Sequence, residues 1–295
     1  MPNVTANGIQ IEYDTFGDRS SPPLLLIMGL GAQMILWDEE FCDQLASQGL
    51  YVIRFDNRDI GLSTKFDEAG VPNVMEMMAA AQRGEEVKAP YTVDDMADDA
   101  VGLLDSLDID KAHICGASMG GMIAQTVASR HPSCVLSLIS IMSTTGDPAL
   151  PQAKPEAMEV LLTPVPEKRE AYIEHSLKAS RTIGSPGFPF DEKRVRERTA
   201  RGFDRSFHPQ GVARQLAAVI AHGSRKPALA KVTTPTLVIH GADDPLVPVE
   251  GGRDTASAIP EAELLIIEGM GHDLPIGAWP RIVDAIARNT RRAQV

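Results

Sequence analysis

The feature that most constrains this chain is a series of short, nearly continuous apolar runs that alternate with segments of helical periodicity. A strand whose two faces are both covered by helices is apolar throughout, whereas a strand with one face in water alternates apolar and polar residues. The pattern therefore predicts an α/β fold with a mostly parallel sheet flanked by helices. The expected strands are residues 24–28, 51–55, 113–115, 135–139, 236–239 and 264–267, and the expected helices are residues 92–107, 119–130, 251–258 and 280–291.

Two parts of the chain depart from this rhythm. Residues 9–16 alternate polar and apolar side chains and predict an antiparallel hairpin at the edge of the sheet. From about residue 145 to residue 231 the pattern is helical and punctuated by prolines, with helices expected at 154–162, 167–183, 191–204 and 210–222. A helical block inside a parallel α/β pattern predicts an inserted cap over the strands' carboxyl ends. We expect an α/β core domain of residues 1–144 and 232–295 and a helical cap domain of residues 145–231.

Charge and composition narrow the classes of partner. The formal net charge of −12 argues against a nucleic-acid partner and disfavours anionic membranes and strongly anionic substrates. The amino-terminal residues lack the basic and apolar regions of a signal peptide, and no apolar run approaches the length of a bilayer span. The three cysteines show no metal-binding or disulfide spacing. We expect a cytoplasmic protein that acts on a small molecule, and the oligomeric state stays open.

The strongest chemical signal is Gly116-Ala117-Ser118-Met119-Gly120, which follows an expected strand and precedes an expected helix. A nucleophilic serine needs a sharp, strained turn that lifts its hydroxyl away from the sheet, and glycines on both sides avoid collisions with neighbouring backbone. The motif alone is common by chance, and the alternative is an ordinary tight turn. Its strand–turn–helix context favours Ser118 as a nucleophile, with Gly116 and Gly120 forming the nucleophile elbow.

A serine nucleophile needs a histidine base and an acid that orients the histidine. His272 lies in the loop after the last expected strand, and Gly271 gives that loop freedom to reach the serine. Asp243 and Asp244 both lie in the turn after the strand at 236–239. Either could serve as the acid, and either could instead cap that turn. The chain order serine, aspartate, histidine is the one that α/β-hydrolases use.

A tetrahedral oxyanion needs two backbone N–H donors. We expect one from Met119, the residue after the nucleophile, and one from Leu30 in the turn Met28-Gly29-Leu30-Gly31 after the first parallel strand. A phosphate-binding loop is the alternative for this glycine-containing turn. It lacks both the Walker lysine and the third glycine of a dinucleotide-binding motif, which argues against a bound nucleotide.

These motifs resemble the α/β-hydrolase superfamily of serine esterases with a helical cap, and within it the family of aclacinomycin methylesterase and related carboxylesterases. The resemblance implies that Asp244, three residues after Gly241, is the acid, with Asp243 second and Asp147 a more distant alternative. It also implies ester hydrolysis through an acyl-enzyme, with no metal and no cofactor. The segments that carry the resemblance are residues 26–29, 53–64, 116–120, 235–239, 241–245 and 267–272.

Substrate choice depends on the cap and on the 64–91 insertion, where the resemblance is weakest. We expect a small to medium, uncharged ester in a pocket for which the candidate lining residues are Met75, Met77, Met78, Leu161, Leu162, Phe188 and Phe190. The alternative for each of them is that it only packs the cap against the sheet domain. Two rival hypotheses are a different reaction of the same triad, either carbon–carbon bond hydrolysis or cofactor-free perhydrolysis, and a member that only binds a ligand. Ser118 excludes dehalogenases and epoxide hydrolases, which need a carboxylate at the elbow.

Overall fold

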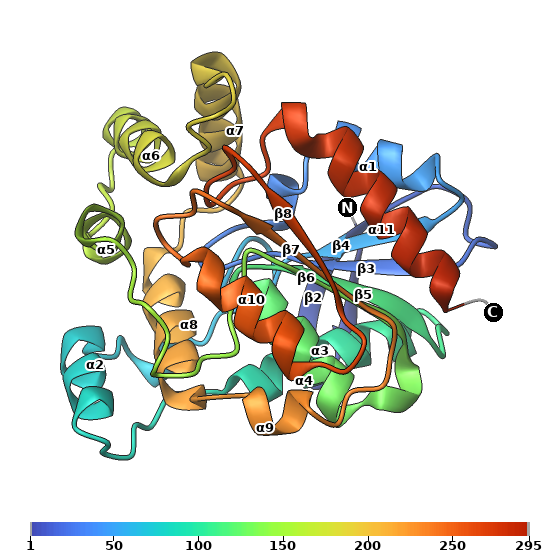
Figure 1. The fold of residues 1–295 in the computed structure, drawn as a ribbon. Coiled ribbons are helices and arrows are strands. Elements are labelled where there is room, and N and C mark those ends of the chain that lie inside the picture. Colours follow the sequence, from blue (N-terminus) through green and yellow to red (C-terminus); the bar gives the residue numbers. More distant parts are fainter. Residues whose placement is uncertain (1, 294–295) are drawn as a thin grey trace.

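The computed structural model describes residues 2–293, and within these residues eight strands form one sheet (Figure 1). The order across the sheet is β1-β2-β4-β3-β5-β6-β7-β8. β2 pairs antiparallel with β1 and β4, whereas the strands from β3 to β8 are all parallel to one another. The strands are β1 (Asn3–Ala6), β2 (Ile9–Phe16), β3 (Pro23–Ile27), β4 (Tyr51–Phe55), β5 (Ala112–Ala117), β6 (Val135–Ile141), β7 (Thr236–Gly241) and β8 (Glu263–Ile267).

Helices cover both faces of the sheet, and β3 shows why its sequence is apolar throughout. Leu25 and Ile27 pack into the cluster that includes α3 (Val93–Ser106) and α4 (Met119–Arg130). Leu24 and Leu26 point to the opposite face, where they join the cluster that includes α1 (Glu39–Ala46) and α11 (Trp279–Arg292). Successive side chains of a strand point to opposite faces, so a strand between two helical layers must be apolar at every position. The predicted α/β class is confirmed.

Most predicted elements lie within two residues of their observed bounds. The helix expected at 92–107 begins after Thr92, whose side chain and backbone form a capping box with Asp95. The alternating segment 9–16 is β2, which forms an antiparallel hairpin with β1 at the edge of the sheet, as predicted, with β1 outermost. The sequence analysis did not predict α1 or α2 (Val74–Gln82). α10 (Val249–Ala258) contacts β7 and β8.

No helix of residues 2–293 is long and apolar enough to cross a membrane.

The helical insertion follows β6 and precedes β7, and Figure 1 shows its helices at one side of the molecule, in yellow-green to orange. No strand occurs in residues 142–235, all of which the structure describes. The division of the chain at residues 145 and 231 into core and cap domains stays a prediction, which this arrangement supports. The helices are α5 (Pro155–Leu162), α6 (Arg169–Ile183), α7 (Glu192–Arg205), α8 (Pro209–His222) and the short α9 (Lys226–Leu229).

α7 is attached to the core by charge rather than by apolar packing. None of its described residues is buried. Arginines recur along one side of the helix and pair with carboxylates of the core: Arg194 and Arg198 with Asp38, Arg201 with Glu39, and Arg205 with Asp56. The Gln33 side chain adds hydrogen bonds to the carbonyls of Gly202 and Ser206, at 2.7 and 2.8 Å. This polar contact joins α7 to the core.

Candidate active site

Ser118 occupies a strained turn between β5 and α4. Its φ of 56° lies in the left-handed region, which a residue with a side chain rarely adopts, and its backbone N–H donates to the Ile141 carbonyl of β6 at 2.9 Å. Strain of this kind persists where the surrounding structure fixes it, and it concentrates at functional sites. The turn lies at the carboxyl end of the central strand β5, between β3 and β6.

Gly116 and Gly120 are required by close backbone approach on either side of this turn. A Cβ atom on Gly116 would lie 1.9 Å from the Gly120 carbonyl oxygen, and one on Gly120 would lie 2.0 Å from the Ile27 carbonyl oxygen. Both contacts are with backbone, so no side-chain rotation can relieve them. The two glycines therefore fit the role expected of the elbow residues.

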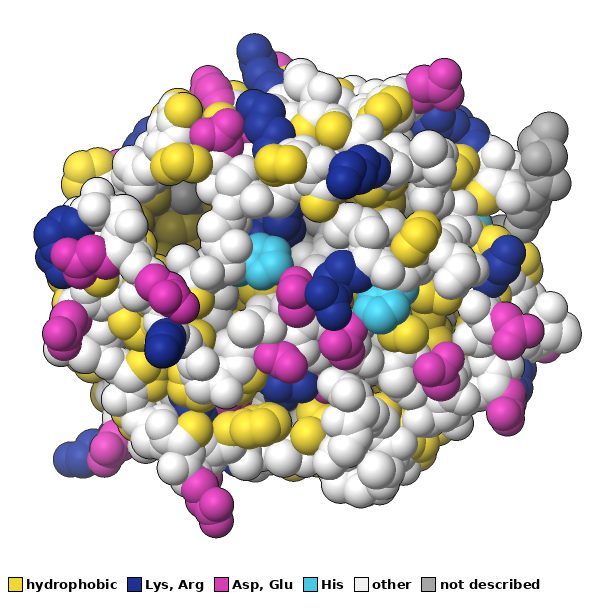
Figure 2. Space-filling view, turned by 90° about the horizontal axis from the view of Figure 1, so that it is seen from below, with side chains coloured by type: hydrophobic (Ala, Val, Ile, Leu, Met, Phe, Trp, Pro, Cys, Tyr) yellow, Lys and Arg dark blue, Asp and Glu magenta, His cyan; other side chains and the backbone are white. Residues whose placement is uncertain are grey.

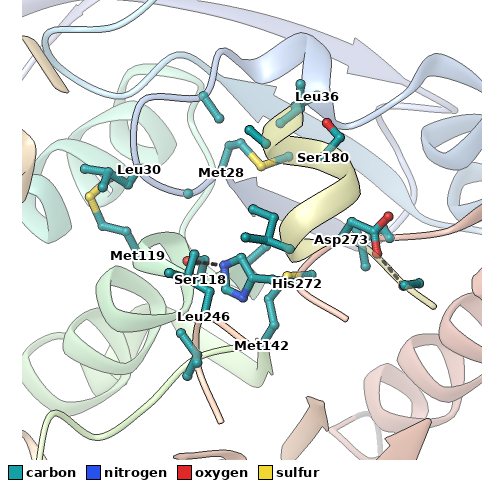
Figure 3. Close-up of a pocket in the computed structure, with 18 of the residues that line it drawn as sticks. Met28, Leu30, Leu36, Ser118, Met119, Met142, Ser180, Leu246, His272 and Asp273 are labelled. Atoms are coloured by element: carbon teal, nitrogen blue, oxygen red, sulfur yellow. Dashed lines mark hydrogen bonds between the residues drawn. The ribbon is translucent and has the colours of Figure 1, made fainter. Parts of the chain in front are cut away.

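The structure brings the predicted serine, histidine and aspartate together in one hydrogen-bonded chain. His272 Nε2 lies 3.0 Å from Ser118 Oγ, and His272 Nδ1 lies 2.7 Å from Asp244 Oδ2. Figure 3 shows Ser118 and His272 pointing toward one another, with Met119 and Leu30 beyond the serine. The side chains of Asp244 and His272 are buried, at 0% and 8% exposure. This is the geometry that a general base and its orienting acid require.

Asp244 is held firmly in this position. Its second oxygen, Oδ1, accepts the backbone N–H groups of Leu246 and Val247, each at 2.9 Å. His240 lies behind it, with Nε2 3.6 Å from Asp244 Oδ2 and 2.8 Å from the Val247 carbonyl oxygen that it donates to. Burial lowers the pKa of His240, which favours the neutral ring, while the Val247 carbonyl and Asp244 partly oppose this shift. The sequence indicated His240 only as a strand residue, because no local motif marks a histidine that lies behind the acid.

The two other aspartates considered for the acid lie elsewhere. The Asp243 carboxylate accepts the Gly269 N–H at 2.9 Å, which fixes the loop that carries His272. Asp147 pairs with Lys226 at 3.2 Å, and its pKa is lowered by the Ala149 N–H that it accepts and by this lysine. The aspartate hydrogen-bonded to His272 is Asp244.

The turn that contains Leu30 packs directly against the serine. A Cβ atom on Gly29 would lie 3.1 Å from the Ser118 Cβ atom. The Gly31 N–H is occupied by Gln215 Oε1 at 2.9 Å, so it cannot serve as an oxyanion donor at the same time. Met119 is the first residue of α4, where backbone N–H groups have no acceptor within the helix. These contacts favour Leu30 and Met119, while their role as oxyanion donors stays a prediction.

A cavity of about 940 Å³ opens over Ser118 and His272. Leu161, Phe188 and Phe190 line it, as expected, but Met75, Met77, Met78 and Leu162 do not. α2, which carries the three methionines, has no buried residue among those described, and it contacts α8 instead. Seen from below, the side of the molecule that carries α5 and α8 is hollowed, and hydrophobic side chains lie deep in the hollow (Figure 2).

The cavity wall is mostly apolar, and its charged side chains include a polar corner formed by Asp38, Asp273, Arg194 and Arg198. Burial raises the pKa of both carboxyl groups, and the arginines partly offset that rise. In the part of the chain that the structure describes, no three His, Cys, Asp or Glu side chains are grouped as metal ligands would be. The sequence analysis missed this corner, because charged residues at helical spacing look like an ordinary solvated face.

Comparison with known proteins gives one family and several relatives. The α/β hydrolase fold family matches residues 22–277. Rhodomycin D methylesterase DauP of Streptomyces sp. (strain C5) is 31% identical, over 99% of this chain and 98% of its own. A 2-hydroxy-6-oxononadienedioate/2-hydroxy-6-oxononatrienedioate hydrolase of Cupriavidus pinatubonensis is 33% identical over 58% of this chain and 59% of its own. The structure of a thermophilic esterase from Thermogutta terrifontis superposes with a TM-score of 0.72 at 23% identity, covering 100% and 99% of the two chains.

Proposed function

Because the chain belongs to the α/β-hydrolase fold family, we propose that it is a serine esterase that cleaves a carboxylic ester through an acyl-enzyme. The family and the hydrolase class were both predicted from the sequence, and both are confirmed. The finer proposal depends on one observation, the continuous hydrogen-bonded chain from Ser118 through His272 to Asp244. A methylesterase that is similar over almost the whole length supports an ester as the substrate.

The proposed reaction has two halves. His272 Nε2 takes the proton of the Ser118 hydroxyl as Oγ attacks the ester carbonyl, and the alcohol leaves with that proton. Asp244 accepts the Nδ1–H of His272 and stabilises the imidazolium while it exists. In the second half, His272 takes a proton from water as the water oxygen attacks the acyl carbonyl. The bond between Ser118 Oγ and the acyl carbon then breaks, His272 returns the proton to Oγ, and the carboxylic acid leaves. The N–H groups of Leu30 and Met119 stabilise the negative oxygen in both halves.

We propose a medium-sized, uncharged ester with an apolar body as the substrate class. The mostly apolar wall and the cavity volume of about 940 Å³ support an organic molecule of substantial size that is covered rather than exposed. Comparison of kcat/KM for butyryl, octanoyl and palmitoyl esters of one alcohol, below their aggregation limits, tests this class. A clear optimum at palmitoyl would contradict it and indicate a lipase.

The nucleophile is tested by Ser118→Ala. We expect the variant to lose covalent labelling by a fluorophosphonate and to lose ester turnover by about 10³-fold or more, since only binding and the oxyanion donors remain. Circular dichroism serves as the folding control. Persistent labelling of the variant would show that another residue is the nucleophile.

The acid is tested by a pair of neighbouring substitutions. Asp244→Asn leaves His272 without the carboxylate that fixes its tautomer, and we expect a loss of kcat of about 10²- to 10⁴-fold. Asp243→Asn disturbs only a backbone contact to Gly269, and we expect a loss below about tenfold. If Asp243→Asn proved the more damaging, the acid would be Asp243.

A second candidate reaction of the same triad is carbon–carbon bond hydrolysis. The relative from Cupriavidus pinatubonensis, a hydrolase of an oxo-dienedioate, is the observation that favours it. The polar corner with Arg194 and Arg198 is the part of the cavity that could face a substrate carboxylate. Parallel assays with an uncharged aryl ester and with a dienoate ketone decide between the two reactions. Turnover of the ketone alone would overturn the esterase proposal.

A further inference from the structure

The loop that carries His272 is held from two sides, and one of those sides belongs to the helical insertion. On the core side, Asp243 fixes the loop through the N–H of Gly269 and through its own N–H, which donates to the Met270 carbonyl at 3.0 Å. On the other side lies the connection between α6 and α7, residues 183–187, which we call the α6–α7 connection. These residues are about 85 positions distant in the sequence from the loop that they contact.

The α6–α7 connection binds the base loop through its backbone. The backbone N–H of His272 itself donates to the Ile183 carbonyl at 2.7 Å, and the N–H of Gly187 donates to the Gly269 carbonyl at 2.9 Å. The two segments touch so closely that glycines are needed where they meet. A Cβ atom on Gly271 would lie 2.2 Å from the Gly184 carbonyl oxygen.

Ser185 adds two side-chain hydrogen bonds between this connection and the base loop. Its hydroxyl accepts a hydrogen bond from the N–H of Gly271 at 2.9 Å and donates one to the Asp273 carboxylate. Ser185 therefore binds both residues that flank His272. Figure 3 shows Asp273 directed away from Ser118, with its hydrogen bond drawn as a dashed line. Burial raises the pKa of Asp273. The hydrogen bond from the Ser185 hydroxyl opposes this rise more strongly than any other group does.

On the basis of the proposed function, we propose that Ser185 is a positioning residue for the base, through which the helical insertion holds His272 in reach of Ser118. A general base must stay within about 2.6–3.2 Å of the atom whose proton it takes. A displacement of about 1 Å can cost on the order of 10²-fold in rate. Because the insertion supplies two contacts to the residues next to His272 and one to its own N–H, the base is in place only when the insertion is seated. The helical insertion therefore covers the cavity and positions the base of the triad at the same time.

The test is Ser185→Ala, which removes both hydrogen bonds of the hydroxyl. We expect kcat for an uncharged aryl ester and the rate of fluorophosphonate labelling to fall about 10- to 100-fold, while KM changes by less than about threefold, because the substitution removes one hydroxyl from the large, mostly apolar cavity wall. Ser185→Thr keeps the hydroxyl and is expected to retain most of the activity. This split between kcat and KM, with rescue by threonine, would not follow from a merely structural role.

Thr182→Ala is the matched control. Its hydroxyl lies three residues earlier and bonds only the Lys178 carbonyl of its own helix, so we expect activity within about twofold of the original. Asp273→Ala is a second variant, which removes the acceptor of the Ser185 hydroxyl if Ser185→Ala fails to fold, and it should lower kcat in the same way.

Three outcomes decide the matter. A kcat within twofold of the original in folded Ser185→Ala, or an equal loss in Thr182→Ala, would overturn the positioning role. If Ser185→Ala does not fold, an unchanged kcat in Asp273→Ala overturns it instead. If the original protein is not labelled at all, the serine mechanism itself is wrong, which separates failure of the proposed function from failure of this inference.

Discussion

The floor and the roof of the cavity are built by opposite physical means. The floor is the turn from β5 through Ser118 into α4, where backbone contacts backbone and most of α4 is buried in the core. The roof includes α7, none of whose described residues is buried and whose arginines pair with carboxylates of the core. The floor is therefore fixed by shape and apolar burial, whereas the position of the roof depends on charge.

The nucleophile and the base are positioned by different parts of the molecule. Close packing allows only one arrangement at the elbow, so the nucleophile is positioned by the fold itself. Ion pairs at a half-exposed interface contribute little individually and are weakened by salt. α7 is therefore fixed less firmly than the elbow, and His272 stands at the boundary because the core and the connection before α7 both bind its loop. Four substitutions or conditions test whether the two regions differ in this way.

The largest effect is expected from Gly120→Ala, on the floor. The added Cβ atom would lie 2.0 Å from the Ile27 carbonyl oxygen, so β3 and α4 would have to separate. We expect a loss of more than about 4 kcal/mol in the free energy of unfolding, or no soluble folded protein. Soluble yield and near-ultraviolet circular dichroism measure this. A variant with the original melting temperature would show that the elbow is not closely packed.

A smaller loss is expected where charge is buried, between α8 and the loop after β4. Arg214 is 1% exposed, and it donates two hydrogen bonds of 2.8 Å to Asp59, whose side chain is fully buried. Arg214→Met leaves that carboxylate buried without its main partner, and we expect a cost of about 3–5 kcal/mol in urea unfolding.

Arg196→Met is the matched control on the exposed side of α7. Its pairs with Glu174 and Glu192 are solvated, so we expect a change of about 0.5 kcal/mol or less. Equal costs at the two positions would mean that burial does not distinguish these ion pairs.

A pH-dependent effect is expected from His113, which lies in β5 beneath the elbow. It is fully buried, and burial lowers its pKa to about 4, whereas in the unfolded chain the pKa is about 6.5. The unfolded chain therefore binds more protons between these values, so the free energy of unfolding falls as the pH is lowered through this window. From pH 7 to pH 5 this one group contributes a loss on the order of 2 kcal/mol.

His113→Asn tests that contribution through urea unfolding at the two pH values. The variant should lose less stability between pH 7 and pH 5 than the original protein does, whatever its stability at pH 7. The same dependence on pH in both proteins would show that His113 titrates in the folded chain as it does when unfolded.

The elbow at the floor of the cavity could be predicted from the sequence far better than the helical segments of its roof, because the contacts of the elbow are local in the chain. The elbow is local, because Gly116, Ser118 and Gly120 must be close in the chain to form one turn, and its apolar flanks identify the strand and the helix. The contacts of Ser185 with Gly271 and Asp273 join segments about 85 positions apart, and no residue spacing indicates them. The prediction that Met75, Met77 and Met78 line the pocket was wrong. An apolar cluster predicts burial, but it does not indicate which part of the protein the cluster packs against.

The smallest effect, opposite in sign to the first, is expected from Gly202→Ala in α7. Only the Gln33 side-chain nitrogen, at 3.8 Å, comes near the position of the added Cβ atom, which is ordinary contact. Alanine reduces the conformational freedom of the unfolded chain and favours the helix, by about 0.5–1 kcal/mol over glycine. The same substitution that disrupts the floor should therefore stabilise the roof, and urea unfolding of the two variants measures the difference. A loss of stability in Gly202→Ala would mean that α7 is packed as tightly as the elbow, and the distinction between a floor fixed by shape and a roof fixed by charge would have to be abandoned.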